Sequence, residues 1–491
     1  MLTKRQIGRN TFQHVKPHSD GLRFKCMQIQ ERVSNMSKKW TKSLSVLLSI
    51  LLVAIFVSAC GGDKKSAEPA SGSAAAPSAK ASESQKSDAP KTEKTNIKFW
   101  VLFDGSDADT MRKIVEDYNG THPDSQVTLE FQDNAQYYTK LKTAILGGTG
   151  PDLAISHIGG NINGMAATGD LIPLDQEASR LGVDIAFDKY SKDPTTAANI
   201  GGKQYAVPLD NLVRVLMYNK DVLSKAGLVG QDGKLNFQMS FDGFKQALDK
   251  VKASSPGVQP LTVSMKPPQL VLVWLSLYYQ LGGTDFLSIE QKKATFDDAK
   301  ATEALKALHD LYAAYVPAKL TDPAGLDMFK AGKSAFFIDG SWSIGAAAQA
   351  LGDKFGVTGF PYLFSTPTEV TTSHGFVLPK NADRTDAETK AALEFIKWFG
   401  DNNWKWAQAG HVPAYGPALE TPEFKALPYH PQFTEPGRNV VALPVIPGTM
   451  LHQAPEVKDF VQAAVSGDKT PEEAVALIRK GVDSMLSQLV K

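Results

Sequence analysis

Between residues 97 and 156 the sequence alternates short apolar runs with amphipathic segments. IKFWVLF (97–103), VTLEF (127–131) and DLAIS (152–156) are short apolar or β-branched runs that predict buried strands. DADTMRKIVEDYN (107–119) begins with capping acids, and QYYTKLKTAIL (136–146) is followed by two glycines, so both predict helices. A strand–helix–strand–helix–strand order implies parallel strands joined by helical crossovers, and hence an α/β layered domain.

The same mixture of elements continues to the end of the chain. We expect further strands at 204–209, 213–219 and 334–339, and helices at 241–252, 301–315, 385–400 and 471–489. No internal repeat is visible.

Polar loops follow several of the predicted strands. Asp104 and Asp107 follow the first strand, Ser156 and His157 stand at the end of the third, and Trp342 follows a later one. Ligands of such sheets bind beyond the carboxyl ends of the strands. Aspartate accepts hydrogen bonds from hydroxyls and tryptophan offers a flat apolar face, a mixture that suits sugars. Taken alone, each loop is better explained by an ordinary turn or by core packing, because Asp-Gly is usually a turn and tryptophan is usually buried in a core.

Charge and cysteine content exclude several classes of function. The net charge of +1 is unevenly distributed, because residues 1–59 hold ten Lys/Arg against two acids and leave 43 basic and 50 acidic residues from Cys60 onward. A nucleic-acid-binding protein needs a basic footprint, so we expect no nucleic-acid partner. Cys26 and Cys60 are the only cysteines, which excludes a disulfide framework, a thiolate metal site and a cysteine nucleophile in the body.

The N-terminal region has the pattern of an export signal. From Met36 a basic start leads into an apolar stretch at 44–57, which is short for a hydrocarbon core of about 30 Å, so a secretory signal is favoured over a membrane-anchor helix. VSAC (57–60) resembles a bacterial lipobox, in which the cysteine is acylated and becomes the mature N-terminus. We therefore expect translation to start at Met36, or else at Met27, and residues 1–59 to be extension and signal peptide. The lipidated Cys60 would anchor the protein to the outer face of the cell membrane.

Residues 60–95 have the composition of a tether. They are rich in Ala, Ser, Lys, Pro and Glu and have no aromatic residue, so they cannot bury a core and we expect them to be disordered. A coil of this length spans roughly 33 Å on average, which keeps the body close to the membrane.

From residue 96 onward the sequence resembles the extracellular solute-binding proteins of ABC importers, in the sugar-binding group that includes the maltose-binding protein. The resemblance covers nearly all of 96–491 and depends on motifs that occur in the family's order rather than on any one of them. These motifs are YYTKLKTAILGGTGPDLAI (137–155), GDLIPLD (169–175), GGKQYAVPLDNLVRVLMYNKDVLSKAGL (201–228), FKAGKSAFFIDGSW (329–342), HGFVLPK (374–380) and GHVPAY (410–415).

The resemblance implies an α/β, two-lobe periplasmic-binding-protein-like fold of type II, with central mixed sheets flanked by helices and hinge crossovers. Lobe 1 would comprise 96–207 and 366–402, and lobe 2 would comprise 208–365 and 403–491. A solute held between the lobes would favour a closed state that the permease recognises. The implied partners are a small-molecule solute, which we expect to be a carbohydrate, and ABC permease subunits. We expect a monomer without catalytic residues, cofactor or metal.

The family's cleft positions fall on residues of several motifs. They are Asp104, Asp107, Ser156, His157, Asp210, Asn211 and Trp342. Trp342 would stack on a sugar face, and Asp104 and Asp107 would accept hydrogen bonds from hydroxyls.

The sequence departs from the maltose-binding pattern at three positions. The maltose-binding protein has a tryptophan where Ser156 falls, so its aromatic cage is incomplete here. His374 stands where relatives often have Gly-Gly, and we expect it and His411 to face the cleft, which argues against a plain maltodextrin ligand. Trp274 is another candidate for the wall of the cleft, but its apolar surroundings favour the core, and Trp398 is expected in the core.

Other functions remain open on the sequence alone. A glycan-active hydrolase needs two carboxylates that flank a sugar site, and Asp104, Asp107 and Asp210 could converge in this way. A surface sensor or adhesin would share the anchor and the fold. An anionic solute would require a cation in the cleft, for which Arg214 is the obvious candidate.

Overall fold

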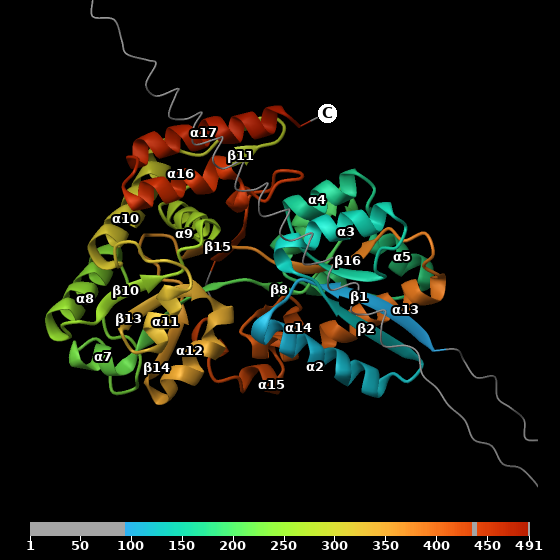
Figure 1. Cartoon of the computed structure of the whole chain (residues 1–491), viewed down its shortest axis with the longest axis horizontal. Helices are drawn as coiled ribbons and strands as arrows, with labels where there is room; N and C mark the ends of the chain where they lie inside the picture. Colours follow the sequence, from blue (N-terminus) through green and yellow to red (C-terminus); the bar gives the residue numbers. More distant parts are fainter. Residues whose placement is uncertain (1–93, 435–438, 490–491) are drawn as a thin grey trace, which may run out of the picture. The chain divides into compact units, whose positions relative to one another are not determined.

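The computed structural model describes residues 94–434 and 439–489. The predictions for the signal, for Cys60 and for nearly all of the tether fall on residues 1–93 and lie outside the described residues. The described chain is built around two main sheets, each with its own helices (Figure 1).

The first sheet has the strand order β2-β1-β3-β16-β4, and β7 also pairs with β16. β1 runs parallel to β2 and to β3, which confirms the parallel arrangement predicted from the alternating segments. β16 runs antiparallel to β3 and places His374 opposite His157. A strand from late in the chain therefore fills the middle of this sheet. The bounds are β1 (Thr95–Val101), β2 (Ser125–Phe131), β3 (Leu153–His157), β4 (Leu171–Ile172), β7 (Val207–Pro208) and β16 (His374–Pro379).

Helices pack on this sheet and bury an aromatic core. The Phe99 ring on β1 lies 5.9 Å from Phe376 on β16 and 5.7 Å from Phe395 on α13, measured between ring centroids. α13 starts where its sequence predicts, because Thr385 and Glu388 form a capping box. The helices are α2 (Gly105–Thr121), α3 (Tyr137–Leu146), α4 (Gly160–Ala167), α5 (Leu174–Leu181), α6 (Lys192–Ala197) and α13 (Asp386–Asp401).

The second sheet has the order β10-β13-β9-β14. Its central strand β9 is antiparallel to β13 and to β14, whereas β10 is parallel to β13. Leu216 and Tyr218 of β9 belong to one core, and Val215 and Met217 belong to another, so both faces of this sheet are covered. The strands are β9 (Arg214–Asn219), β10 (Gln259–Val263), β13 (Ser334–Gly340) and β14 (Phe355–Gly359).

Five helices around the second sheet were not predicted from the sequence: the short helices α7, α11 and α12, and the longer α9 and α16. α9 is buried over most of its surface, so it lacks the one-sided apolar stripe that marks a surface helix. Among the described residues, no helix has both the length and the apolar character needed to cross a membrane. The helices are α7 (Lys220–Lys225), α8 (Phe241–Ser254), α9 (Pro267–Gln280), α10 (Asp298–Tyr315), α11 (Ala324–Lys330), α12 (Ile344–Leu351), α16 (Pro455–Ser466) and α17 (Pro471–Ser487).

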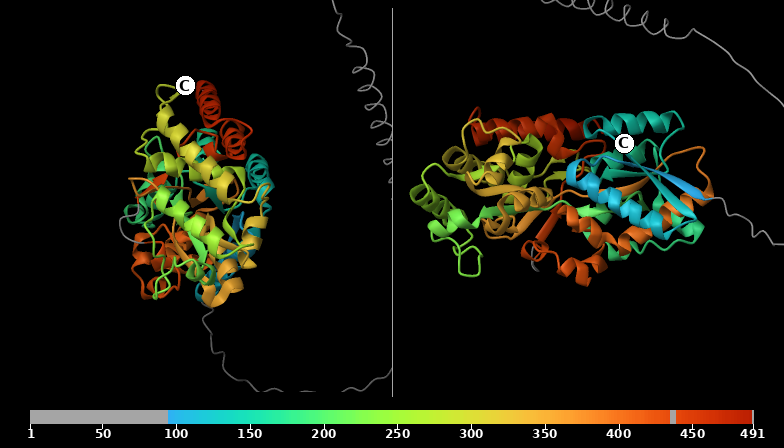
Figure 2. Two further views of the ribbon diagram at one scale, coloured as in Figure 1. Left: turned by 90° about the vertical axis from the view of Figure 1, so that its left-hand side faces the viewer. Right: turned by 60° about the horizontal axis from the view of Figure 1, so that its bottom comes forward.

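Chain crossings connect the two sheets and their helices (Figures 1 and 2). The first crossing runs from β7 through β8 (Asp210–Asn211) to β9, and the second runs from β15 (Thr368–Thr371) to β16. The third leaves α13 through the 3₁₀ segment η5 (Asn403–Ala409) and continues as β17 (Val412–Pro413), which pairs with β8. β18 (Asn439–Ala442) pairs with β15, so these segments brace one another.

Two details of the sequence prediction are wrong. The strand expected at 204–209 is split into β6 (Lys203–Gln204) and β7, because the chain turns away from the first sheet here. Trp398 lies at the edge of the first core and not inside it, with the Lys405 ammonium 5.5 Å from its ring. The core position predicted for Trp274 is confirmed, since this residue is fully buried and its indole N–H donates to the Ala301 carbonyl at 2.9 Å.

We predict that Trp274→Ala lowers the free energy of unfolding by about 3–5 kcal/mol, because it removes a fully buried indole and leaves a cavity. Urea denaturation followed by circular dichroism measures this change. Trp398→Ala is the matched control and should cost less, since its ring is already partly exposed. Equal losses in the two variants would contradict the core position of Trp274.

Candidate functional site

The Asp210 carboxylate binds groups from the other two crossings. It is fully buried, and its Oδ1 accepts the backbone N–H of His374 at 2.8 Å. Its Oδ2 lies 2.9 Å from His374 Nδ1 and accepts the indole N–H of Trp406 at 2.9 Å. β8, β16 and η5, which belong to three different crossings, are therefore connected through one side chain.

His411 links this carboxylate to a second one. Its Nδ1 lies 3.4 Å from Asp210 Oδ2, and its Nε2 lies 3.1 Å from Asp107 Oδ2. Neither ring nitrogen is aligned as a hydrogen-bond donor, so the contacts are ion pairs rather than hydrogen bonds. The ring also stacks on Trp406, with a centroid distance of 4.7 Å and an interplanar angle of 5°. We refer to Asp107, Asp210, His374, Trp406 and His411 as the crossing cluster.

The electrostatics of the cluster follow from burial and from pairing. Burial opposes ionisation of Asp210, but His374 and His411 outweigh it and bring the pKa of Asp210 down to about 2. Burial likewise opposes the charge of His411, yet Asp107 and then Asp210 outweigh it and raise the pKa of His411. His411 therefore keeps its proton to a higher pH than an ordinary histidine does, in a position between two carboxylates.

His157 lies beside the cluster and is held neutral. Its ring centroid is 4.7 Å from that of His374, and burial lowers its pKa well below the usual range. Its backbone N–H donates to the Tyr138 hydroxyl at 2.9 Å, and its Nδ1 lies 2.7 Å from the same oxygen. Ser156 is fully buried and sits opposite Gly375 of β16, so it is part of the sheet.

Trp342 and Asp104 lie outside the cluster. Trp342 is half-buried in the 3₁₀ turn η3 (Ser341–Ser343) that ends β13. A Cβ on Gly410 would stand only 2.3 Å from the Ser341 carbonyl oxygen and 3.3 Å from the Trp342 Cα, so this turn packs closely against the residue that precedes His411. Asp104 is exposed at the N-cap of α2, and its carbonyl accepts the N–H of Ala108 at 3.2 Å.

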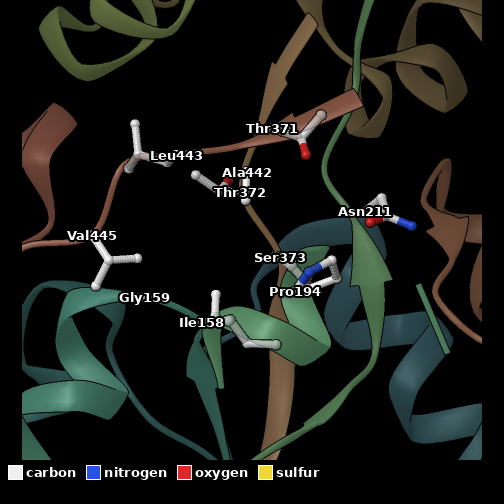
Figure 3. A pocket seen from close by; sticks show the side chains of 11 residues that line it. Ile158, Gly159, Pro194, Asn211, Thr371, Thr372, Ser373, Ala442, Leu443 and Val445 are labelled. Carbon is white, nitrogen blue, oxygen red and sulfur yellow. The ribbon is translucent and has the colours of Figure 1, made fainter. Parts of the chain in front are cut away.

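Asn211 lines two cavities beside the crossings. The first cavity is lined by Ile158, which follows β3, by Ser373, which precedes β16, and by Val445, which follows β18, among others (Figure 3). The second has a volume of about 450 Å³ and includes Glu369 and Val412 in its wall. The Asn211 amide also donates to the Ser191 hydroxyl at 2.9 Å, which ties the crossing to α6.

Arg214 is neutralised within the protein. Its guanidinium Nη1 lies 3.8 Å from the buried Glu369 carboxylate and donates to the Val370 carbonyl at 2.9 Å, and Nη2 donates to Gln269 Oε1 at 3.1 Å. The Arg214 backbone N–H donates to the same Glu369 carboxylate. Arg214 therefore carries a structural ion pair at the start of β9.

Sequence reasoning missed Trp406 and Tyr138. Trp406 is fully buried against Asp210, whereas its neighbour Trp404 is half-buried, and their shared sequence NWKW gives no sign of the difference. Within residues 94–434 and 439–489, no group of histidine and carboxylate side chains is arranged to hold a metal ion.

Residues 104–405 match the family model described as "Bacterial extracellular solute-binding protein". This segment contains the first sheet apart from β1, the whole second sheet, and Asp107, Asp210 and His374 of the crossing cluster. The chain belongs to this family. The fold class predicted from the sequence, α/β with two central sheets and connecting crossings, is confirmed by the solved structures that this solute-binding protein resembles.

Curated relatives and solved structures resemble this family member over lengths that range from about half of the relative to all of it. The sn-glycerol-3-phosphate-binding periplasmic protein UgpB of Rhizobium meliloti is 22% identical over 408 residues, which are 78% of this chain and 91% of the relative. The arabinooligosaccharide-binding protein of Halalkalibacterium halodurans is 26% identical over 237 residues, 47% of this chain and 48% of the relative. The solved structure of the GacH receptor of Streptomyces glaucescens has a TM-score of 0.68 at 20% identity, and the match covers 81% of this chain and 100% of that chain.

We predict that Asp210→Asn lowers the free energy of unfolding at neutral pH by about 2 kcal/mol, because the folded pKa lies below the ordinary value. The carboxylate of the wild type contributes this stability above about pH 4 and loses it as the pH falls toward 2. The difference between wild type and variant, from urea denaturation at several pH values, should shrink over that range. Asp386→Asn, which removes an exposed partner of Arg180, is the control and should change little at any pH. A loss for Asp210→Asn that stays constant down to pH 2 would contradict the pairing.

Proposed function

We propose that this protein captures an uncharged sugar or oligosaccharide between its two α/β halves and delivers it to the permease of an ABC importer. The observation that carries the proposal is the meeting of Asp107, Asp210, His374 and His411 at the crossings, in a chain that belongs to the solute-binding family. Lobe 1 would comprise 96–207 and 366–402, and lobe 2 would comprise 208–365 and 403–491.

The charge balance of the site supports an uncharged solute. Arg214, the cation that an anionic ligand would need, is already paired with Glu369. His411 is paired with Asp107 and Asp210, and burial keeps His157 neutral. A carboxylate or phosphate on the solute would meet Asp107 and Asp210, while Arg214 and His411 already have carboxylate partners of their own. The relative that binds an arabinooligosaccharide is thus a closer guide to the solute than the relative that binds glycerol phosphate.

The proposed contacts use the half-buried and exposed groups near the crossings. Trp342 would stack on a sugar face, and Asp104 and Asp107 would accept hydrogen bonds from its hydroxyls. Ser156, His157, Asp210, Asn211, His374 and His411 would form or support the polar wall of the same site. The protein would act as a monomer and without catalysis, in keeping with a family of binding proteins.

We predict that a thermal-shift screen at pH 7 with maltose, raffinose, arabino-oligosaccharides and sn-glycerol-3-phosphate identifies a saccharide that stabilises the protein. At 100 times its dissociation constant, a ligand adds about 2.7 kcal/mol to the free energy of unfolding, which is easily visible. The glycerol phosphate should give no shift. The proposal would be overturned if none of the saccharides raised the unfolding temperature. It would also be overturned if the protein hydrolysed one of them.

We predict that Trp342→Ala weakens binding of the saccharide identified in this way by about tenfold, equivalent to about 1.4 kcal/mol, because the stacking face is lost. Isothermal titration calorimetry measures the effect. Trp404→Ala is the matched control, since Trp404 is also half-buried and lies against Lys405 on η5. Unchanged affinity in Trp342→Ala would remove this residue from the site.

The proposed membrane anchor is the acylated Cys60 at the start of the tether, which falls outside the described residues. We predict that the mature protein partitions with membranes and has a mass that matches a chain beginning at Cys60 plus its acyl groups. Cys60→Ser should lack the acyl mass and keep the residues that precede position 60. Intact-mass spectrometry of wild type and variant tests this, and a wild-type mass without acyl groups, or an acylated Cys60→Ser variant, would contradict the anchor.

A further inference from the structure

His411 occupies an unusual position in the crossing cluster. Its side chain is 1% exposed, and its two ring nitrogens lie 3.4 Å from one carboxylate, Asp210, and 3.1 Å from another, Asp107. An imidazolium in such a place stabilises both carboxylates, and its removal would leave two negative charges close together in a poorly solvated site. His411 therefore determines whether both carboxylates can stay where they are.

Asp107 is the member of this triplet that can reach a solute. Its side chain is 19% exposed, whereas that of Asp210 is fully buried. It belongs to the first turn of α2, directly after the exposed residues 104–106 that follow β1. One carboxylate oxygen pairs with His411, while the other, Oδ1, is buried without a hydrogen-bond partner. Such an oxygen is an acceptor without a donor, and a solute hydroxyl would supply one.

We propose that His411 is a positioning residue for the solute site: its imidazolium holds the Asp107 carboxylate in place to accept a solute hydroxyl, so that affinity falls when His411 loses its proton. The proposal rests on the proposed function, because it assigns a proton to the same site. Capture of the solute is then linked to pH through a group that does not itself need to touch the solute.

The groups that face His411 come from every element packed around it. Asp107 comes from α2, Asp210 from β8, and His374 from β16 with a ring centroid 6.1 Å away. Trp406 of η5 stacks on the ring and carries no charge. His430 of the 3₁₀ turn η6 (His430–Gln432) places its Nε2 3.0 Å from the His411 carbonyl, and burial lowers its pKa to about 4, so it is neutral. The two carboxylates thus dominate the surroundings of His411.

The direction of the pH effect follows from these surroundings. The carboxylates raise the pKa of His411, so the imidazolium persists to a higher pH than in an ordinary histidine and is lost as the pH rises through that raised pKa. If binding requires the proton, the dissociation constant rises by up to about tenfold for each pH unit above that pKa. Affinity is therefore expected to be constant well below this pKa and to fall as the pH rises above it.

The first experiment measures binding of the saccharide that gives the largest thermal shift, by calorimetry at pH values from about 6 to about 9. The wild type should lose about tenfold or more in affinity over this range, whereas His411→Gln should bind weakly throughout with a flat profile. His430→Gln is the matched control, because it removes a neighbouring imidazole without changing the charge at His411 and should keep the wild-type profile. A wild-type profile that is flat, or an alkaline loss that persists in His411→Gln, would overturn the proposal.

The second experiment needs no solute. The pKa of His411 is followed by NMR with ¹³C-labelled histidine in the wild type and in Asp107→Asn, assigned with the His411→Gln variant. Removal of the carboxylate should lower this pKa measurably, while the signal of His430 should not move. An unchanged pKa would show that Asp107 and His411 are not coupled and would overturn the proposal. If no saccharide binds at any pH while the coupling is present, the proposed function fails instead, and the two failures are distinguished.

Discussion

A buried carboxylate in a connecting strand has to be compensated, and Asp210 is such a group. Removing its charge from water costs several kcal/mol, which only close and well-directed partners can offset. Those partners are His374, Trp406 and His411, and they come from the two other crossings. The carboxylate therefore fixes the relative positions of three segments that are distant in sequence. The three crossings carry most of the polar groups proposed for the solute site, so the contacts of Asp210 also set the positions of those groups.

The parts of the fold that could be predicted are those whose signal is local. The alternating segments of 97–156 predicted β1, α2, β2, α3 and β3, because each carries its own periodicity. α9 was missed because a helix buried on all sides has no apolar stripe. The insertion of β16 beside β3 could not be derived from periodicity, since it depends on pairing between distant residues. Residues 204–209 were predicted as one strand but form parts of two short ones, because the sequence pattern does not show where the chain leaves the sheet.

The candidate site was predicted as a set of residues but not as a set of contacts. Polar residues at strand ends and the family resemblance pointed to Asp107, Asp210, His374 and His411. Their mutual pairing needs the crossings to be in place, and a sequence does not specify it. Trp406 was missed for the same reason, because only its indole N–H contact with Asp210 distinguishes it from an ordinary tryptophan. The residue types can be read from the sequence, whereas the contacts between residues far apart in the chain exist only in the folded protein.

The antiparallel strand β16 has a consequence for how the chain reaches its native state. It occupies a central place in the first sheet, between β3 and β4, yet it begins only at His374, after the whole of the second sheet. β3 and β4 therefore lack their partner β16 until most of the chain is available, and the contacts that complete the sheet join residues far apart in the sequence. Such non-local pairing slows folding. A chain that has been synthesised only as far as the second sheet would remain incompletely folded, which is the state that passage through a translocation pore requires. The two halves of the protein would then complete their folding together.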